Sequence, residues 1–309
     1  MAMLRFICRR TVSMLIALWI IVTVTFFMMH AVPGGPFARE KRIPEAILKN
    51  IEARYKLDQP VYVQYWDYLQ HLVKWDLGPS FKYDNRTENQ IINEGFPVSA
   101  GLGAVAIALA LALSVPAGVI SALRHNQWQD STAMFISVVG IAVPNYVVAA
   151  LLMYVFAYKL GWFPAALWGT PKHMVLPAIA LAARPCAYLA RLVRSSMLEV
   201  LNQDYVRTAK AKGLPGFLVV YKHAMKNALI PVITFLGPEV AAVFTGSFVI
   251  ERIFAVPGIG REYVTSIYNR DYTVIMGMTV FYAILLLGLN LVIDIIYAFL
   301  DPRIQYEKG

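Results

Sequence analysis

The chain of 309 residues carries a formal net charge of +9, yet only 15% of its residues are charged and 58% are hydrophobic. Soluble domains contain about 25% charged and about 45–50% apolar residues, so this composition excludes an ordinary soluble protein and indicates a membrane protein. The basic excess does not predict a nucleic-acid partner, because Lys and Arg concentrate in the cytoplasmic loops of membrane proteins.

Six apolar segments are long enough to cross a membrane, which takes about 20 residues in a helix. The sequence therefore predicts an all-α integral membrane protein with spans at Thr11–His30, Val98–Leu123, Thr132–Tyr158, Met174–Val193, Leu229–Ile250 and Val274–Leu300. The first segment is too long for the apolar region of a signal peptide, and no cleavage site follows it. We expect it to remain as the first helix of residues 1–30, ahead of a permease core at 98–300.

The distribution of basic residues predicts the orientation. With a cytoplasmic N-terminus, thirteen Lys and Arg residues fall in cytoplasmic segments and five in the short outer loops. The positive-inside rule therefore places both termini, including the tail 301–309, in the cytoplasm. The segment 31–97 then lies outside, where aromatic residues mixed with charges predict short amphipathic helices. Such helices serve as a structural cap or as a contact for an external partner.

Several motifs for chemistry are missing or fail in context. Gly101-Leu102-Gly103-Ala104 begins a G-x-G-x-x-A pattern, but inside a membrane helix it indicates, with Ala108 and Ala112, a small-residue face for helix packing. The sequence has no P-loop for ATP, no nucleophile elbow and no closely spaced histidine pair for a metal. We therefore expect no enzyme activity, cofactor or metal in this chain.

The polar segment Ser195–Asn227 carries the strongest local signals. Asn202-Gln203-Asp204 offers residues that start helices, and Gly213 stands where a helix end requires a left-handed conformation. Pro215 suits the first position of a second helix, Pro215–Met225. This predicts a compact helix–turn–helix at the cytoplasmic face. On pattern alone, such an element either inserts into a groove of another protein or binds anionic lipid.

The run Tyr205–Leu214, followed by His223-Ala224 and Asn227–Pro231, resembles the coupling loop of bacterial ABC importer permeases, in particular the dipeptide, oligopeptide and nickel subfamily. Arg207-Thr208-Ala209 stands where the broader family has Glu-Ala-Ala, which puts in doubt any salt bridge from that glutamate. Two further blocks are similar to the same subfamily: one around Thr245–Glu251, Pro257–Gly260 and Asn269–Asp271, and one from Phe26 to Ala100 that resembles oligopeptide permeases in particular.

The resemblance implies a permease subunit of an ATP-driven oligopeptide importer in the bacterial cytoplasmic membrane. It implies four kinds of partner besides lipid: a homologous permease, two ATPase subunits that hold ATP and Mg²⁺, and an extracytoplasmic peptide-binding protein. Dipeptide, nickel and glutathione import remain alternatives, and an ATP-independent secondary transporter is a more remote one. The residues expected to couple to the ATPases are Tyr205, Arg207, Thr208, Ala209, Lys210, Ala211, Lys212, Gly213, Leu214, Pro215 and His223.

Three ionisable residues lie in or near apolar segments: Arg184, Glu239 and Asp294. A charge inside the bilayer is costly and usually faces a cavity or a partner, so these residues are candidates for a translocation path. The expected second to fifth spans also contain prolines, which free backbone carbonyls and indicate either a polar path between broken helices or kinks that serve packing.

Overall fold

The structure is a computed structural model that describes residues 2–33, 56–83, 85–244 and 247–300, and these ranges are almost entirely helical. The expected tail 301–309 and residues 34–55 of the outer segment lie outside them. Five described helices are long and apolar enough to cross a membrane, or six when one bent pair counts as a span. The prediction of an all-α membrane protein with about six spans is confirmed. The long elements are α1 (Ala2–Ala31), α4 (Glu88–Leu123), α5 (Trp128–Ala142), α7 (Pro171–Leu201), α11 (Ile230–Phe244) and α14 (Tyr272–Leu300).

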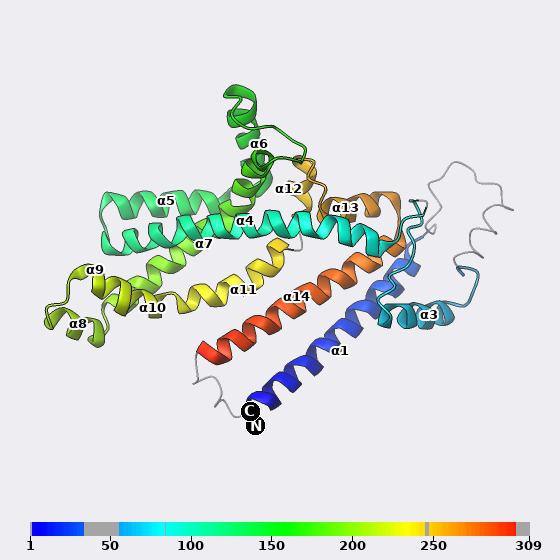
Figure 1. Cartoon of the computed structure of the whole chain (residues 1–309), viewed down its shortest axis with the longest axis horizontal. Helices are drawn as coiled ribbons and strands as arrows, with labels where there is room; N and C mark the ends of the chain where they lie inside the picture. The colour runs from blue at the N-terminus through cyan, green and yellow to red at the C-terminus, as the bar shows by residue number, and fades with distance from the viewer. Residues whose placement is uncertain (1, 34–55, 84, 245–246, 301–309) are drawn as a thin grey trace.

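Shorter elements lie at the two ends of these helices. One end holds α8 (Asp204–Ala211), α9 (Gly216–Leu218), the π-helical η2 (Val219–Ala224) and α10 (Met225–Ala228), beside the turn between α4 and α5 (Figure 1). The opposite end holds α3 (Val61–Val73) and α13 (Ile259–Asn269), with α12 (Phe248–Ile253) between α11 and α13 in the sequence. Helix α7 packs against α4, α5 and α11, while α1 lies along α14.

Helix α4 begins at Glu88, ten residues before the expected start of the second span. The reason is a capping box: Thr87 Oγ1 accepts from the Gln90 backbone N–H at 3.3 Å, and Gln90 Oε1 accepts from the Thr87 N–H at 3.0 Å. Both backbone donors at the helix start are thereby satisfied, which fixes the first turn outside the apolar run. The last residues of the expected outer segment 31–97 are therefore the start of this long helix.

Small residues of α4 allow α7 to approach closely. A Cβ atom added at Gly118 would lie 2.6 Å from Val193 Cβ and 2.7 Å from the Ala190 carbonyl oxygen. Gly103, a member of the expected packing face, is buried, but Ala104, Ala108 and Ala112 of that face are exposed. A Cβ atom at Gly103 would meet Val243 and Phe244 of α11. The other buried small residues lie on the opposite side of α4 from the three exposed alanines and are Ala106, Ala110, Ser114 and Gly118.

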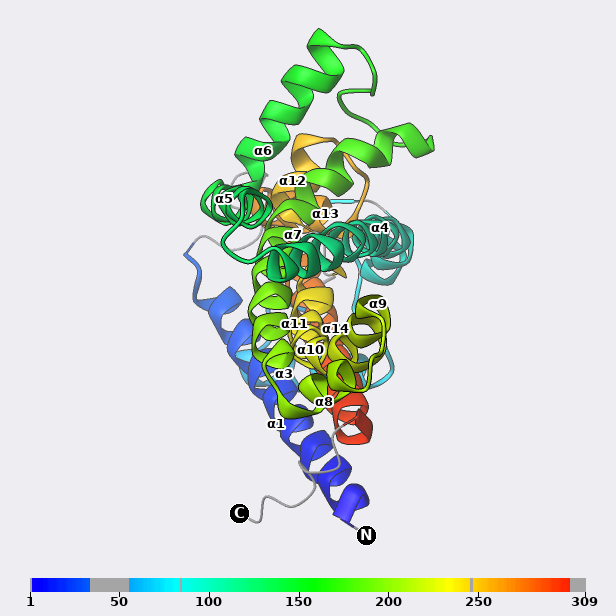
Figure 2. The ribbon, with the colours of Figure 1, turned by 90° about the vertical axis from the view of Figure 1, so that its left-hand side faces the viewer.

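The expected third span, Thr132–Tyr158, is sharply bent. Helix α5 and the pair α6 (Asn145–Leu152) and η1 (Met153–Lys159) meet at 106°. Pro144 has no N–H to continue the helix of α5, and the preceding Val143 is extended with ψ 123°, as a residue before proline prefers. Figure 2 shows α6 and η1 projecting from the other helices.

Candidate functional site

The segment 204–228, which we call the knob, is built from α8, α9, η2 and α10. Helix α8 ends at Ala211 with Lys212 as its C-cap, and Gly213 then adopts φ +75°, a conformation that suits glycine. Pro215 follows in an extended conformation as the N-cap of α9. The turn thus forms at the predicted residues. The second helix differs from the expected Pro215–Met225, because it becomes π-helical between Val219 and Ala224.

The knob is attached firmly to the end of α7. Val206, Ala209 and Val219 form a small buried cluster against which Val200 and Leu201 of α7 pack. The Asn227 side-chain amide also donates to the Tyr205 hydroxyl at 2.8 Å, which ties α10 to α8. The knob and the end of α7 are therefore packed together.

The outer surface of the knob is basic and aromatic. Among the predicted coupling residues, Ala209 is buried and His223 is half-buried, whereas the others are exposed: Tyr205, Arg207, Thr208, Lys210, Ala211, Lys212, Gly213, Leu214 and Pro215. Phe217 and Tyr221, outside the predicted set, stack with ring centroids 5.8 Å apart and are 74% and 64% exposed. The sequence could have indicated this pair, because residues four positions apart lie on the same face of a helix. An exposed aromatic pair is typical of a protein-docking surface.

Two of the three expected path residues come together on a face formed by α7 and α11. The rings of Tyr188 in α7 and Phe235 in α11 stack at 4.2 Å. Helix α7 runs toward the knob and α11 runs away from it, so Arg184, one turn before Tyr188, and Glu239, one turn after Phe235, lie on the same side of this stack. The Arg184 charge acts on the Glu239 carboxylate, although the two described side chains form no direct ion pair.

Asp294, the third expected path residue, is placed elsewhere. Its carboxylate accepts from Arg10 Nε at 2.5 Å, and this ion pair joins α14 to α1. Its contact is therefore a link between two helices, and it does not share the face that carries Arg184 and Glu239.

The end opposite the knob is held by two carboxylates that stand in the blocks resembling peptide permeases but were not predicted as site residues. Asp271, at the start of α14, accepts from the Phe81 backbone N–H at 3.1 Å and from Thr273 Oγ1 at 2.9 Å, and it also accepts from Ser80 Oγ. Glu251 in α12 is fully buried and accepts from Ser99 Oγ of α4. These contacts fix the polypeptide before α4 and the α12–α13 turn against the long helices.

A cavity of about 320 Å³ lies near this end, between α1, α3 and α14. Its aromatic wall includes Phe26, Tyr68 and Tyr272, and burial raises the pKa of the Tyr68 hydroxyl, which therefore stays protonated. The cavity receives no side chain from α7 or α11, so it is separate from the face of Arg184 and Glu239. Within the described residues, no group of three or more His, Cys, Asp or Glu could hold a metal ion.

Comparison with known proteins identifies the class of this membrane protein. Residues 114–306 match the model of the binding-protein-dependent transport system inner membrane component, and residues 3–102 match the N-terminal model of such membrane components. The chain belongs to this family of transport permeases, and it is therefore a multi-pass inner-membrane transport component.

Two curated relatives cover nearly the whole chain. The dipeptide transport system permease protein of Bacillus subtilis is 50% identical over 306 residues, covering 99% of each chain. The oligopeptide transport system permease protein of Salmonella typhimurium is 44% identical, covering 98% of this chain and 100% of the relative. The crystal structure of an amino acid ABC transporter with histidines shares the fold, with a TM-score of 0.52 at 17% identity, over 68% of this chain and 94% of that one.

Proposed function

We propose that this chain is a permease subunit of an ATP-driven importer that moves oligopeptides across the bacterial cytoplasmic membrane. The observation that carries the proposal is the knob, a basic and aromatic helix–turn–helix fixed to α7 at one end of a membrane permease. An exposed docking element of this kind suits a separate motor subunit, because the chain itself has no nucleotide-binding motif. The full-length similarity to an oligopeptide permease supports the cargo.

In this proposal the knob and both termini lie in the cytoplasm. The knob, with Gly213 at its turn, enters a groove on one of two ATP-binding subunits, which hold ATP and Mg²⁺. A second, homologous permease completes the membrane path, an extracytoplasmic peptide-binding protein delivers cargo to it, and lipid surrounds the helices. Closure of the ATPases on ATP moves the knob and α7 as a rigid body and exposes the path to the outside, and hydrolysis resets it.

The α7–α11 face is the proposed wall of the path. A peptide carries a cationic amino end, an anionic carboxyl end and an apolar or mixed middle. Arg184 and Glu239 offer both charges within one turn of the Tyr188–Phe235 stack, and neither charge is consumed by an ion pair in the described chain. Charged residues in membrane helices are tolerated where they face the interior of a helix bundle or a water-filled path.

A second candidate cargo is a dipeptide. The observation that favours it is the 50% identity to a dipeptide permease over 99% of the chain, compared with 44% for the oligopeptide permease. The two cargoes share the same chemistry and differ in the length between the charged ends. The choice between the two cargoes therefore depends on the distance between the groups of the complete path that bind the two charged ends.

The test begins with purification of the chain in mild detergent from native membranes and mass spectrometry of the proteins that accompany it. We expect a second permease and P-loop ATPases. The purified complex, in proteoliposomes with its binding protein, is then assayed for ATP-dependent uptake of labelled di-alanine, tri-alanine, penta-alanine and Ni²⁺. Uptake of the longer peptides supports the oligopeptide reading, and uptake of di-alanine alone supports the dipeptide reading. Solute transport by the isolated chain without ATP would overturn the proposal.

A further inference from the structure

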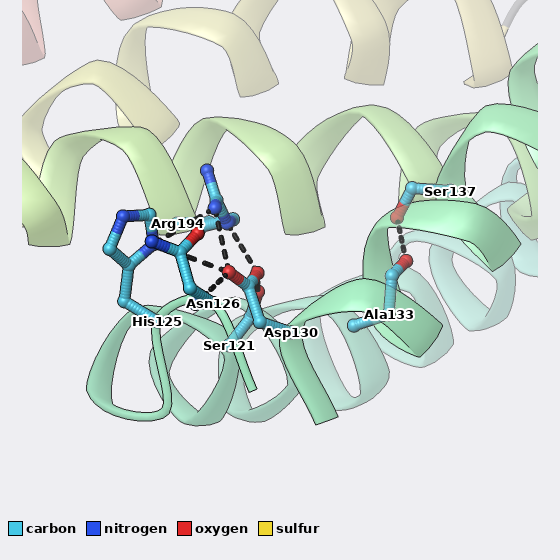
Figure 3. Close-up of polar contacts among 7 residues, drawn as sticks. All are labelled: Ser121, His125, Asn126, Asp130, Ala133, Ser137 and Arg194. Carbon is cyan, nitrogen blue, oxygen red and sulfur yellow. Dashed lines mark hydrogen bonds and ion pairs between the residues drawn. The ribbon is translucent and has the colours of Figure 1, made fainter. Parts of the chain in front are cut away.

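A second polar cluster lies at the knob end of the molecule, at the turn between α4 and α5. Asp130, in the first turn of α5, is only 3% exposed, although it carries a charge. Figure 3 shows its carboxylate pointing toward Arg194 of α7, with Ser121 and His125 around it. The cluster takes no part in the α7–α11 face or in the outer surface of the knob.

The contact between Asp130 and Arg194 is two-pronged. Arg194 Nε donates to Oδ1 of Asp130 at 2.5 Å, and Arg194 Nη2 donates to Oδ2 at 2.7 Å (Figure 3). A fork of this kind fixes orientation as well as distance, since both parallel hydrogen bonds must be satisfied together. A buried carboxylate also has little water to replace a lost partner.

The remaining acceptor positions of Asp130 are used by the α4–α5 turn itself. Ser121 Oγ donates to Oδ1 at 2.5 Å, and the backbone N–H of Asn126 donates to Oδ2 at 2.9 Å. His125 Nδ1 lies 3.2 Å from Oδ2 and 3.1 Å from Arg194 Nη2. One carboxylate thus joins the end of α4, the turn and the start of α5 to a single side chain of α7.

Arg194 lies near the end of α7 to which the knob is attached. Arg194 is seven residues before Leu201, which packs in the cluster that attaches the knob to α7, and seven helical residues span about 10 Å. Close by in the α4–α7 interface, Val193 and Ala190 lie closely against Gly118. The two-pronged ion pair adds a directional contact between α5 and α7, and Ser121 extends it to α4, so the register of these helices is fixed where the knob is attached.

We propose that Asp130 and Arg194 are positioning residues that make α4, α5 and α7 move as one body when an ATPase displaces the knob. Without this pair, α7 slides against α4 and α5, and ATP hydrolysis moves the knob without the full movement of the path. The inference rests on the proposed function, because it assumes that the knob docks on an ATPase. In this inference the cluster keeps ATP hydrolysis coupled to peptide uptake. The cluster itself contacts neither cargo nor nucleotide.

The decisive measurement is the number of peptides taken up per ATP hydrolysed, in proteoliposomes holding the whole importer and its binding protein, with labelled di-alanine and tri-alanine as probes. For Asp130→Asn we expect hydrolysis within about twofold of the unmodified complex and a fall of about tenfold in peptides per ATP. Arg194→Lys keeps the charge but loses the fork, so its ratio should fall to an intermediate value. This second variant decides the matter if Asp130→Asn fails to assemble.

A control exists at the opposite end of the molecule. Asp67 in α3 pairs with Lys56 at 2.8 Å and lies 3.6 Å from His71, so it repeats the combination of an aspartate, a cation and a histidine away from the knob. Asp67→Asn should leave the number of peptides per ATP unchanged. An unchanged ratio in Asp130→Asn or Arg194→Lys, or an equal fall in Asp67→Asn, would overturn the inference.

A distance measurement gives a readout that a merely stabilising role would not change. Spin labels at Trp128→Cys in α5 and Lys226→Cys in α10, with Cys8 and Cys186 replaced by alanine, report whether α5 and the knob move together. We expect the same label distance with and without ATP when the Asp130–Arg194 pair is intact, and a nucleotide-dependent change in Asp130→Asn. Identical behaviour in both proteins would refute the inference. An unmodified importer that shows no ATP-dependent uptake would instead refute the proposed function.

Discussion

The hydroxyl of Ser99 in α4 donates a hydrogen bond of 2.8 Å to the buried carboxylate of Glu251 in α12, and it accepts one of 3.0 Å from the backbone N–H of Ile259. One small side chain of α4 therefore holds α12 and α13, whose bonded residues lie 152 and 160 positions further along the sequence. The connection fixes α12 and α13 against the N-terminal half of α4.

We expect Ser99→Ala to destabilise the protein. The substitution leaves Glu251 without one of its donors and the Ile259 N–H without an acceptor, and a buried polar group left without its partner costs about 1–3 kcal/mol. The melting temperature of the detergent-purified complex, followed by fluorescence-detected size-exclusion chromatography, should fall. Ser114→Ala is the matched control, because Ser114 is also buried in α4 but its hydroxyl has no hydrogen-bond partner among the described residues. Equal melting temperatures for the two variants would contradict this account.

The second prediction concerns cargo. Glu239→Gln removes the negative charge from the α7–α11 face and should weaken uptake of peptides with a free amino end by about tenfold, which corresponds to about 1.4 kcal/mol of lost interaction. Peptides with an acetylated amino end should be affected much less, since they present no cation to Glu239. The measurement is the ratio of uptake of tri-alanine to that of its acetylated form. Glu94→Gln, at an exposed carboxylate of α4 that pairs with Arg86, should leave the ratio unchanged. A shift common to both peptides would argue against a contact with the amino end.

Much of the fold was predictable because lipid limits the choices available to the backbone. Apolar segments of spanning length must be helices, so composition and hydropathy alone indicated the long elements. The knob was predictable for a different reason, since Gly213 and Pro215 define its turn through backbone geometry and need no distant partner.

The features that were missed depend on contacts between distant residues. Asp130 and Arg194 are 64 residues apart, and neither has a local pattern that reveals the pair. Pro144 is a residue type that breaks helices, and the bend of the third span occurs there. The sequence did not distinguish it from four prolines that lie inside continuous helices, namely Pro116, Pro177, Pro185 and Pro238. The packing face of α4 was predicted only in part, because small residues occur on both faces of the helix and only the positions of α7 and α11 select between them.

The aromatic pair of the knob leads to a prediction on assembly. Phe217→Ala removes the more exposed ring of the stack, and truncation of an aromatic anchor at an interface commonly costs about 2 kcal/mol. We expect fewer ATP-binding subunits to co-purify with the chain, while the second permease is retained. Tyr62→Ala is matched in exposure, since Tyr62 in α3 is also 74% exposed but lies at the opposite end of the molecule. Loss of ATPases in both variants, or in neither, would count against docking through this surface.

The turn of the knob supplies the last prediction, the loss of coupling in Gly213→Val. Gly213 has φ +75°, and a residue with a Cβ pays about 1–2 kcal/mol for a left-handed conformation, with further crowding from a β-branched side chain. A Cβ at Gly213 meets no atom within 4 Å, so the substitution should distort only the local backbone and leave membrane insertion intact. ATP-dependent uptake in proteoliposomes should fall by at least about tenfold, the equivalent of 1.4 kcal/mol. Gly216→Val tests the cause, because Gly216 is equally open to solvent but has no positive φ. It should keep near-normal uptake. Equal losses at the two positions would mean that added bulk on the knob surface blocks docking, rather than a change in the left-handed turn at Gly213. Normal uptake by Gly213→Val would show that the knob does not couple ATP hydrolysis to transport.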